Sequence, residues 1–254
     1  MESKKKILNI ALYAGEIMLK NGGETYRAED VMSRICQVCG IEKVVSFVTP
    51  TGMFLSIDDG MEDGYTYTFQ KEINFREINL TKVSEINDFS RSFNPEMMTL
   101  DDAMAKLKEI DNKKSYAVPL KTAFAGISTA AFTAANGGRP NDAVCAFVIG
   151  MIMFLFVEIY GRIEKNDFIR TLIASAIGAF LAIMSVVLGI CSDTQYILIG
   201  AIYILLPGIA ITNAIRDSLS GDLLAGLVRV FEALVISGSI AIGVGIVLKI
   251  FGMF

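Results

Sequence analysis

The sequence contains no histidine, and this absence excludes several kinds of site. Without an imidazole, the chain cannot form a Ser-His-Asp triad, a Cys-His nucleophile pair or a His-ligated metal centre. Positive charge is also in short supply, because 23 Lys and Arg face 27 Asp and Glu and give a net charge of −4. A nucleic-acid partner would need a basic face. We therefore expect no catalytic residue, no metal, no cofactor and no nucleic-acid partner.

Cysteine is scarce as well, with four residues in the chain. Cys36 and Cys39 form a C-x-x-C pattern, but they lie at the C-terminal end of a predicted helix, just before Gly40. The helix dipole disfavours a thiolate at that end, whereas redox cysteines of this pattern lie at helix N-termini. A zinc site would need two further ligands, and Cys145 and Cys191 lie in or next to apolar runs. We interpret the C-x-x-C pair as small packing residues.

Charged residues become rare after residue 117. Residues 1–117 carry 34 charged side chains and residues 118–254 carry 16, most of them in short breaks between long apolar runs. The mean hydropathy of +0.51 is high for a soluble protein. Several runs are close to twenty residues long, which is the length that a membrane helix needs. The sequence therefore predicts a small cytoplasmic α+β domain over 1–117, followed by a membrane α-helical bundle over 118–254.

The charged part begins and ends with helices. Apolar residues at helical spacing predict one helix that ends at Gly22-Gly23 and another that stops at Gly40. Three β-prone runs at 44–48, 53–57 and 64–69 predict an antiparallel meander. Two more helices follow, and Thr99 with Asp102 suits the start of the last one. The predicted order is α-α-β-β-β-α-α.

The N-terminus has a basic start and then an apolar run, like a signal peptide. Polar residues interrupt that run at Asn9, Tyr13 and Glu16, and no small-residue cleavage site follows. We interpret the segment as an amphipathic helix that stays in the cytoplasm.

The apolar part contains five predicted membrane spans, at about 119–136, 143–160, 168–190, 195–213 and 229–251. The first span is the least hydrophobic, and its many Ala, Gly, Ser and Thr residues suit close packing between helices. We find no internal repeat that would pair these five spans into two related halves, as transporters often do. A homo-oligomer or a second membrane subunit would then complete the structure.

Lys and Arg residues alternate between the predicted loops. They gather before the first span, between the second and third, and between the fourth and fifth, at Lys113, Lys114, Lys121, Arg162, Lys165, Arg170, Arg216 and Arg229. The opposite side holds only Arg139 and Lys249. Because basic loops stay in the cytoplasm, this alternation places residues 1–117 inside and the C-terminus outside the inner membrane.

A helix break and a polar stretch follow each other in the fourth span. Pro207 removes a backbone donor and Gly208 loosens the helix, so the span is predicted to kink or break there. The next polar residues are candidates for substrate binding or coupling: Asn213, Arg216, Asp217 and Asp222. Such discontinuous segments line transport sites. The alternative is an ordinary cytoplasmic loop with a helix cap at Ser220 or Asp222.

Glu232 lies inside the apolar run of the fifth span, where an ionised group is costly unless it is paired or faces water. Arg229 precedes it by one helical turn and could pair with it. Glu232 is either a proton-coupling or substrate-facing carboxylate, or one half of an ion pair near the interface. The sequence leaves both interpretations open.

A second motif lies near the N-terminus, at Gly22-Gly23-Glu24-Thr25-Tyr26-Arg27. Two glycines before a helix N-terminus leave free backbone N–H groups, which could bind an anion or cap against the membrane part. The alternative is a plain joint between two helices.

These motifs resemble those of the threonine/serine exporter family. The similar segments are 14–19, 21–27 and 46–52, and later 206–208, 212–217, 220–222 and 232–233. The resemblance covers nearly the whole chain in the right order. The length and the layout look like the larger subunit of the two-component bacterial members, one of which is implicated in succinate export. Longer relatives fuse the second membrane part into one polypeptide, so the resemblance implies a small, separately encoded membrane partner.

We therefore expect a subunit of a secondary exporter, not an enzyme, that moves small carboxylate-bearing metabolites across the bilayer. The resemblance offers threonine/serine and succinate as substrates. Arg216 or Arg229 could meet the substrate carboxylate, and Asp217, Asp222 or Glu232 could carry the coupled proton. Two alternatives are a membrane-anchored cytoplasmic enzyme and a ligand-sensing or gating subunit. The missing histidine and the five spans, where one would tether, count against the enzyme.

Overall fold

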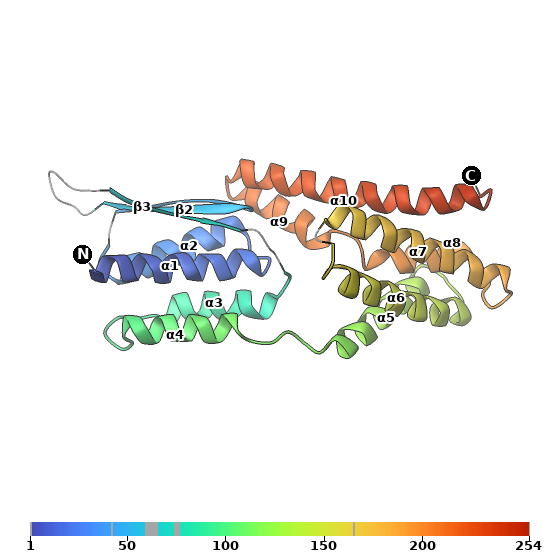
Figure 1. The fold of residues 1–254 in the computed structure, drawn as a ribbon, viewed down its shortest axis with the longest axis horizontal. Helices are drawn as coiled ribbons and strands as arrows, with labels where there is room; N and C mark the ends of the chain where they lie inside the picture. Colours follow the sequence, from blue (N-terminus) through green and yellow to red (C-terminus); the bar gives the residue numbers. More distant parts are fainter. Residues whose placement is uncertain (1, 42, 59–65, 74–76, 165, 254) are drawn as a thin grey trace. The chain divides into compact units, whose positions relative to one another are not determined.

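The computed structural model describes the chain except residues 1, 42, 59–65, 74–76, 165 and 254. The described residues are mostly helical and form two compact units (Figure 1). The first unit contains residues 1–115 and 209–230, and the second contains residues 116–208 and 231–254. The predicted division at residue 117 into a cytoplasmic and a membrane part is a different division, and it stays a prediction.

The first unit combines helices with a three-stranded antiparallel sheet in the order β1-β2-β3. Its elements are α1 (Glu2–Lys20), α2 (Thr25–Val38), β1 (Val44–Thr49), β2 (Gly52–Asp58), β3 (Thr66–Glu72), α3 (Leu80–Ser92) and α4 (Leu100–Asp111). Most of α9 (Gly208–Leu219) and the start of α10 (Leu223–Ile250) also belong to this unit. Part of the predicted turn at 58–60 and the first residues of the predicted strand at 64–69 lie outside the described residues.

One face of the sheet completes the core of the first unit. Met53, Leu55 and Ile57 alternate along β2 and are buried in one cluster with apolar residues of α1 and α2. Phe54 points to the other face, opposite Phe47 of β1, and their ring centroids lie 6.4 Å apart. Both phenylalanines are exposed, as is Val45. The sheet therefore has one buried and one exposed apolar face.

Local sequence signals explain where several helices begin and end. Gly22 has φ +90°, and the N–H of Gly23 donates to Met18 O at 2.9 Å, which closes the end of α1. A Cβ atom at Gly23 would lie 2.8 Å from Met18 O, so only glycine fits this turn. At the start of α4, the Asp102 N–H donates to Thr99 Oγ1 at 3.2 Å, as the sequence predicts.

The second unit is helical. Its elements are α5 (Val118–Ala135), α6 (Pro140–Tyr160), α7 (Asp167–Val187), α8 (Thr194–Tyr203) and the rest of α10. Helices α5 and α6 approach closely at small residues, since a Cβ atom at Gly126 would lie 2.8 Å from Phe147 O. The hydroxyl of Thr129 donates to Ala146 O at 2.8 Å across the same contact. The small residues of the first predicted span thus pack against a neighbouring helix.

Three helices are long and apolar enough to cross a membrane, namely α6, α7 and α10. Helices α8 and α9 together are also long and apolar enough, but they are bent by 55° at the break between them, so they count as a fourth span only if the bent pair is one span. Helix α5 is less apolar, because Lys121 and many hydroxyl-bearing and small residues lower its hydropathy. The structure therefore supports three or four spans within its described residues.

The predicted spans differ in two places from the helices. The predicted span at 195–213 is two helices, and the break between Tyr203 and Gly208 contains Pro207. The predicted span at 229–251 begins earlier, because α10 starts at Leu223. Lys165, which entered the loop-charge argument, lies outside the described residues.

A disulfide joins Cys145 of α6 to Cys191, which precedes α8. The sequence offered no sign of this pairing, because the two residues are 46 positions apart. Beside it, the buried carboxylate of Asp142 accepts the N–H of Arg139 at 2.9 Å and that of Ser192 at 2.7 Å. The bond and the carboxylate together tie the start of α6 to the segment between α7 and α8.

Candidate functional site

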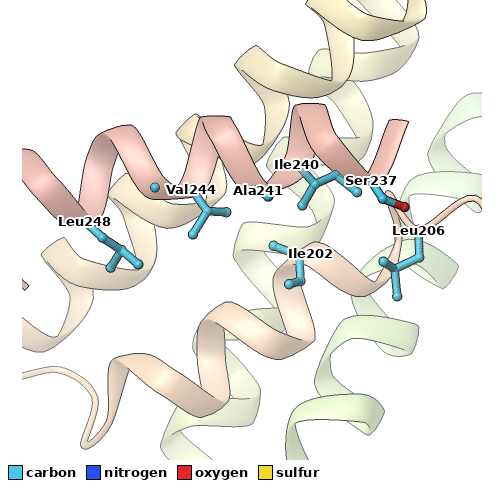
Figure 2. A pocket seen from close by; sticks show the side chains of 8 residues that line it. Ile202, Leu206, Ser237, Ile240, Ala241, Val244 and Leu248 are labelled. Atoms are coloured by element: carbon cyan, nitrogen blue, oxygen red, sulfur yellow. The ribbon is translucent and has the colours of Figure 1, made fainter. Parts of the chain in front are cut away.

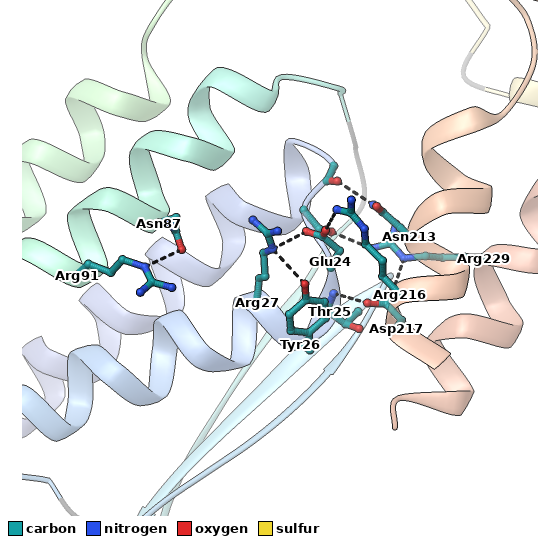
Figure 3. Close-up of polar contacts among 12 residues, drawn as sticks. Glu24, Thr25, Tyr26, Arg27, Asn87, Arg91, Asn213, Arg216, Asp217 and Arg229 are labelled. Atoms are coloured by element: carbon teal, nitrogen blue, oxygen red, sulfur yellow. Dashed lines mark hydrogen bonds and ion pairs between the residues drawn. The ribbon is translucent and has the colours of Figure 1, made fainter. Parts of the chain in front are cut away.

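The two motifs that the sequence singled out meet in the first unit, although they lie about 190 positions apart. The turn between α1 and α2 contacts the hairpin of α9 and α10 through side chains (Figure 3). We call this group the polar cluster; it consists of Gly22, Gly23, Glu24, Thr25, Arg27, Asn213, Arg216, Asp217, Asp222 and Arg229. Most of the predicted site residues therefore belong to one contact network.

An anion does lie at the N-terminus of α2, and it is a side chain of the same protein. Asp217 Oδ1 accepts the N–H of Thr25 at 3.0 Å, and Asp222 Oδ2 accepts the Thr25 hydroxyl at 3.2 Å. Carboxylates are favoured there by the helix dipole and by the unsatisfied N–H groups. The N–H groups of Gly22 and Gly23, which the sequence suggested for this role, instead donate to carbonyls of α1.

Asp217 and Arg229 form a buried ion pair. Arg229 Nε lies 2.9 Å from Asp217 Oδ2, and the two side chains are 5% and 0% exposed. The contact is electrostatic, because the geometry at Nε is not that of a hydrogen bond. Arg229 Nη2 also donates to Gly23 O at 2.9 Å. The arginine thus neutralises a carboxylate and binds the α1–α2 turn at once.

The carboxylate of Glu24 lies between two guanidinium groups. Its Oε1 is 2.6 Å from Arg216 Nη1, and its Oε2 is 3.0 Å from Arg27 Nε. The Glu24 side chain is 5% exposed, whereas those of Arg27 and Arg216 are 38% and 53% exposed. Arginine binds carboxylates well because its planar fork offers several aligned donors. This part of the cluster has the chemistry of a carboxylate-binding site.

Two further contacts hold the hairpin of α9 and α10 in place. The buried Asn213 donates through Nδ2 to Gly22 O at 2.9 Å. Gly226 of α10 packs against α9, since a Cβ atom there would lie 2.9 Å from Ala214 O. The short distance between the two helices brings Asp217 and Arg229 within reach of each other.

Glu29 of α2 is a neighbouring acid that the sequence did not single out. Its Oε1 accepts the N–H of Val48 at 3.0 Å. Burial raises the pKa of the Glu29 carboxyl, and the negative charges of Asp222 and Asp217 add to this, against the effect of the Val48 hydrogen bond. Its place in the middle of a helix gives no local signal of this environment.

Three predicted site residues lie outside the polar cluster. Pro207, Gly208 and Glu232 belong to the second unit. Pro207 is buried before the start of α9, and Glu232 is half-buried on α10. The pairing of Glu232 with Arg229 stays a prediction.

Comparison of the sequence with known proteins assigns the chain to a family. Residues 9–251 match the sequence model of ThrE, described as "Putative threonine/serine exporter". The chain belongs to the threonine/serine exporter family. As a member of this family it is a multi-pass membrane exporter, and the expected resemblance is confirmed.

Relatives of this exporter differ in length. The chain is 21% identical to "Probable succinate transporter subunit YjjP" of Escherichia coli (strain K12), across 99% of the chain and 97% of the relative. It is 21% identical to "Probable threonine/serine exporter" of Mycobacterium tuberculosis, across 96% of the chain but 46% of the relative. It is 20% identical to "Threonine/serine exporter" of Corynebacterium glutamicum, across 94% of the chain and 50% of the relative. No solved structure matches the chain.

Two cavities of different character lie among the described residues of the second unit. One, of about 240 Å³, lies between α8 and α10, and Ser237 is the polar side chain in its apolar lining (Figure 2). The other, of about 700 Å³, is lined by residues of α5, α6 and α8 and includes Lys121. Lys121 Nζ lies 3.6 Å from Glu158 Oε2. The first cavity has no charge for a carboxylate, and the second offers one lysine that is already paired.

The exporter shows no sign of a metal centre in its described part. Within those residues, no group of three or more Cys, Asp or Glu is arranged to hold an ion. The acidic residues of the polar cluster contact arginines, the backbone N–H of Thr25 and the Thr25 hydroxyl instead. In this cluster, the carboxylates of Glu24 and Asp217 are therefore paired with guanidinium groups.

Proposed function

We propose that this chain is a subunit of a secondary exporter that carries small carboxylate-bearing metabolites out of the cell across the inner membrane. The observation that carries the proposal is the carboxylate of Glu24 between the guanidinium groups of Arg27 and Arg216. A half-buried and an exposed arginine that together hold one carboxylate are suited to bind the carboxylate that the expected substrates share. Membership of an exporter family over residues 9–251 supplies the direction of transport.

The two substrate classes in the names of the relatives share one chemical group. The relatives are called a succinate transporter subunit and threonine/serine exporters, and succinate, threonine and serine all carry a carboxylate. Arg216 is the preferred contact for that group, because its side chain is half exposed. Arg229 is buried against Asp217, and in this proposal it keeps the hairpin in position.

In this proposal, a carboxylate near the broken helix carries the coupled proton. Asp217, Asp222 and Glu232 are the candidates, and each has a different setting. Asp217 is fully buried and paired, Asp222 is half-buried and holds the Thr25 hydroxyl, and Glu232 is half-buried on α10. A carboxylate that changes both its partner and its exposure during transport is suited to carry a proton.

The proposed arrangement places five spans in the inner membrane, the residues 1–117 in the cytoplasm and the C-terminus outside. The alternating Lys and Arg residues support this orientation. The Cys145–Cys191 disulfide adds an independent argument, because it lies at the end that this orientation exposes outside, where disulfides persist.

A second membrane subunit or a second copy of the chain completes the proposed exporter. The two relatives that the chain matches almost end to end are both named as a transporter subunit. In the two relatives named as threonine/serine exporters, the matched region is about half of the protein. The remaining half of those proteins is the natural counterpart of a separate subunit.

The test is export from cells that express the chain with its candidate partner. Cells are preloaded with labelled succinate or threonine, and the efflux is followed for Arg216→Ala and Glu232→Gln. Both variants should lose export while their amount in the membrane stays normal. Arg162→Ala is the matched control, since Arg162 is an exposed arginine that pairs with Glu158. Normal export by both test variants would contradict the site assignment.

The alternative of a gating subunit has one observation in its favour. The polar cluster ties the α1–α2 turn to the α9–α10 hairpin, so a ligand of the first unit could alter that hairpin. In that case Arg216→Ala should change the regulation of export but not the substrate preference. A change in the succinate-to-threonine ratio would favour a direct role in binding.

A further inference from the structure

We propose that Arg27 and Arg216 form a carboxylate-binding site that Glu24 occupies as an internal ligand, and that a small carboxylate displaces Glu24 from it. The choice of succinate and threonine as ligands rests on the proposed function, whereas the site itself rests on the geometry of the polar cluster. The site lies entirely in the first unit.

The two arginines present their donors to one point (Figure 3). Arg216 uses Nη1 toward Glu24, and Arg27 uses Nε. Tyr26 orients Arg27, because its hydroxyl accepts from Arg27 Nε at 3.3 Å and its ring centroid lies 6.0 Å from the guanidinium carbon. Both arginine side chains are more than one-third exposed, so an incoming carboxylate can reach their outer faces.

The contacts of Glu24 differ from those of Asp217. Asp217 is bound by the backbone N–H of Thr25 and by the buried Arg229, which fix it inside the protein. Glu24 is the N-cap residue of α2, yet its side chain makes no capping hydrogen bond. Its carboxylate can therefore leave the arginines without removing a cap from the helix.

The exchange conserves charge at the arginines. One carboxylate leaves two guanidinium groups and another takes its place, so neither arginine is left without a counter-ion. The apparent affinity for an external carboxylate is lowered by the fraction of time that Glu24 fills the site. Removal of the Glu24 carboxylate should therefore raise the affinity of the same two arginines.

The experiment measures binding to the purified full chain in detergent. Isothermal titration calorimetry with succinate, threonine and acetate compares the wild-type chain with Glu24→Ala and Glu24→Gln. We expect the dissociation constant to fall by roughly tenfold or more in the variants, as expected when an internal competitor is removed. Ligand should also raise the melting temperature of the variants in a saturable way, measured by circular dichroism. Binding of acetate measures the contribution of the carboxylate group alone. Succinate and threonine show how much the rest of each molecule adds to the affinity.

Two matched variants make the result specific. The double variant Glu24→Ala/Arg216→Ala should lose the gain, because one of the two arginines is absent. Asp30→Asn also removes a carboxylate from an arginine of α2, since Asp30 pairs with the Arg34 side chain at 3.4 Å. That pair has one arginine and is exposed, so Asp30→Asn should bind carboxylates as the wild type does.

Two results would overturn the inference. One is that Glu24→Ala and Glu24→Gln, with wild-type circular dichroism spectra, bind no tighter than the wild type. The other is that the double variant binds as tightly as Glu24→Ala. If Glu24→Ala does not fold, Glu24→Gln keeps the length of the side chain and carries the same comparison.

The binding experiment and the export experiment can fail separately. Tighter binding by the Glu24 variants, together with no export by the wild type, would retain the carboxylate site and contradict the proposed exporter. Normal export with no gain in binding would retain the exporter and contradict the internal ligand.

Discussion

Asp217 and Arg229 form an ion pair within the first unit, with 2.9 Å between Oδ2 and Nε and almost no exposure of either side chain. Each partner also contacts the backbone of the α1–α2 turn, Asp217 at Thr25 and Arg229 at Gly23. The pair therefore joins two parts of the chain that are far apart in sequence. Its removal should affect the packing of the first unit before it affects any chemistry.

Loss of one partner should be costly. Asp217→Asn or Arg229→Met leaves a buried charge without its counter-ion, which costs about 3–5 kcal/mol in buried pairs. The double variant should cost less than the sum of the two, because it leaves neither charge buried. Thermal melts of the purified chain, followed by circular dichroism, measure all three. Melting of either single variant at the wild-type temperature would contradict a stabilising pair.

Two glycines of α10 allow a test of how closely α9 and α10 pack, because one lies at the contact and the other does not. Gly226→Ala places a Cβ atom 2.9 Å from Ala214 O, and α9 must move away to admit it. The melting temperature should fall, and the contact between Asp217 and Arg229 should weaken. Gly238→Ala meets no atom within 4 Å, so the higher helix propensity of alanine should stabilise the chain by up to about 1 kcal/mol. Equal effects of the two changes would show that α9 and α10 do not pack closely.

Three of the four cysteines should resist labelling in the folded, oxidised protein, for two different reasons. Cys145 and Cys191 are bonded, so a maleimide-polymer reagent should add to them only after reduction. Burial, with a smaller effect of Cys39, raises the pKa of the Cys36 thiol to about 12, so Cys36 should stay unreactive at pH 7 in the folded protein. Gel shifts before and after reduction, with Cys145→Ser as control, measure this. Labelling of Cys191 without reduction would contradict the disulfide.

Glu29 should make stability depend on pH. Burial raises its pKa in the folded state, so the folded protein favours the protonated acid. The stability that this acid contributes is present below the ordinary pKa and is lost as the pH rises through the raised value. Glu29→Gln keeps an acceptor for the Val48 N–H and removes the charge. The variant should therefore melt higher than the wild type at pH 7 and equally at pH 4. A larger gain at pH 4 would contradict this sign.

The sequence was most informative where a structural feature depends on neighbouring residues. The end of α1 at Gly22-Gly23, the start of α4 at Thr99 and the interruption around Pro207 follow from backbone chemistry within a few positions. The exposed and buried positions of β2 follow from its alternation. These features need no knowledge of distant contacts.

The features that sequence analysis missed depend on contacts between residues that are far apart in the chain. Thr25 and Asp217 are 192 positions apart, and no local pattern announces that a helix N-terminus will receive that carboxylate. The Cys145–Cys191 bond has the same character. The assignment of α5 as a span stays a prediction, because Lys121 and many small and hydroxyl-bearing residues make this helix less apolar than α6, α7 and α10.

The site residues were also predicted in part: the sequence identified the charged residues but not their contacts. The sequence selected charged residues near a helix break, and the structure gathers Arg216, Asp217, Asp222 and Arg229 around the α1–α2 turn. It could not tell which arginine is buried and which is exposed. That difference separates Arg229, which the proposal assigns to packing, from Arg216, which it assigns to the ligand.

The exposed face of the sheet governs how the protein can be handled. Phe47, Phe54 and Val45 lie together on a surface that the described residues leave uncovered. Exposed apolar patches promote self-association when a protein is concentrated. Purification at low concentration, or a lysine in place of Phe54, should keep the preparation monodisperse on size-exclusion chromatography. The first unit therefore contains the proposed binding site and also limits the protein concentration at which binding to it can be measured.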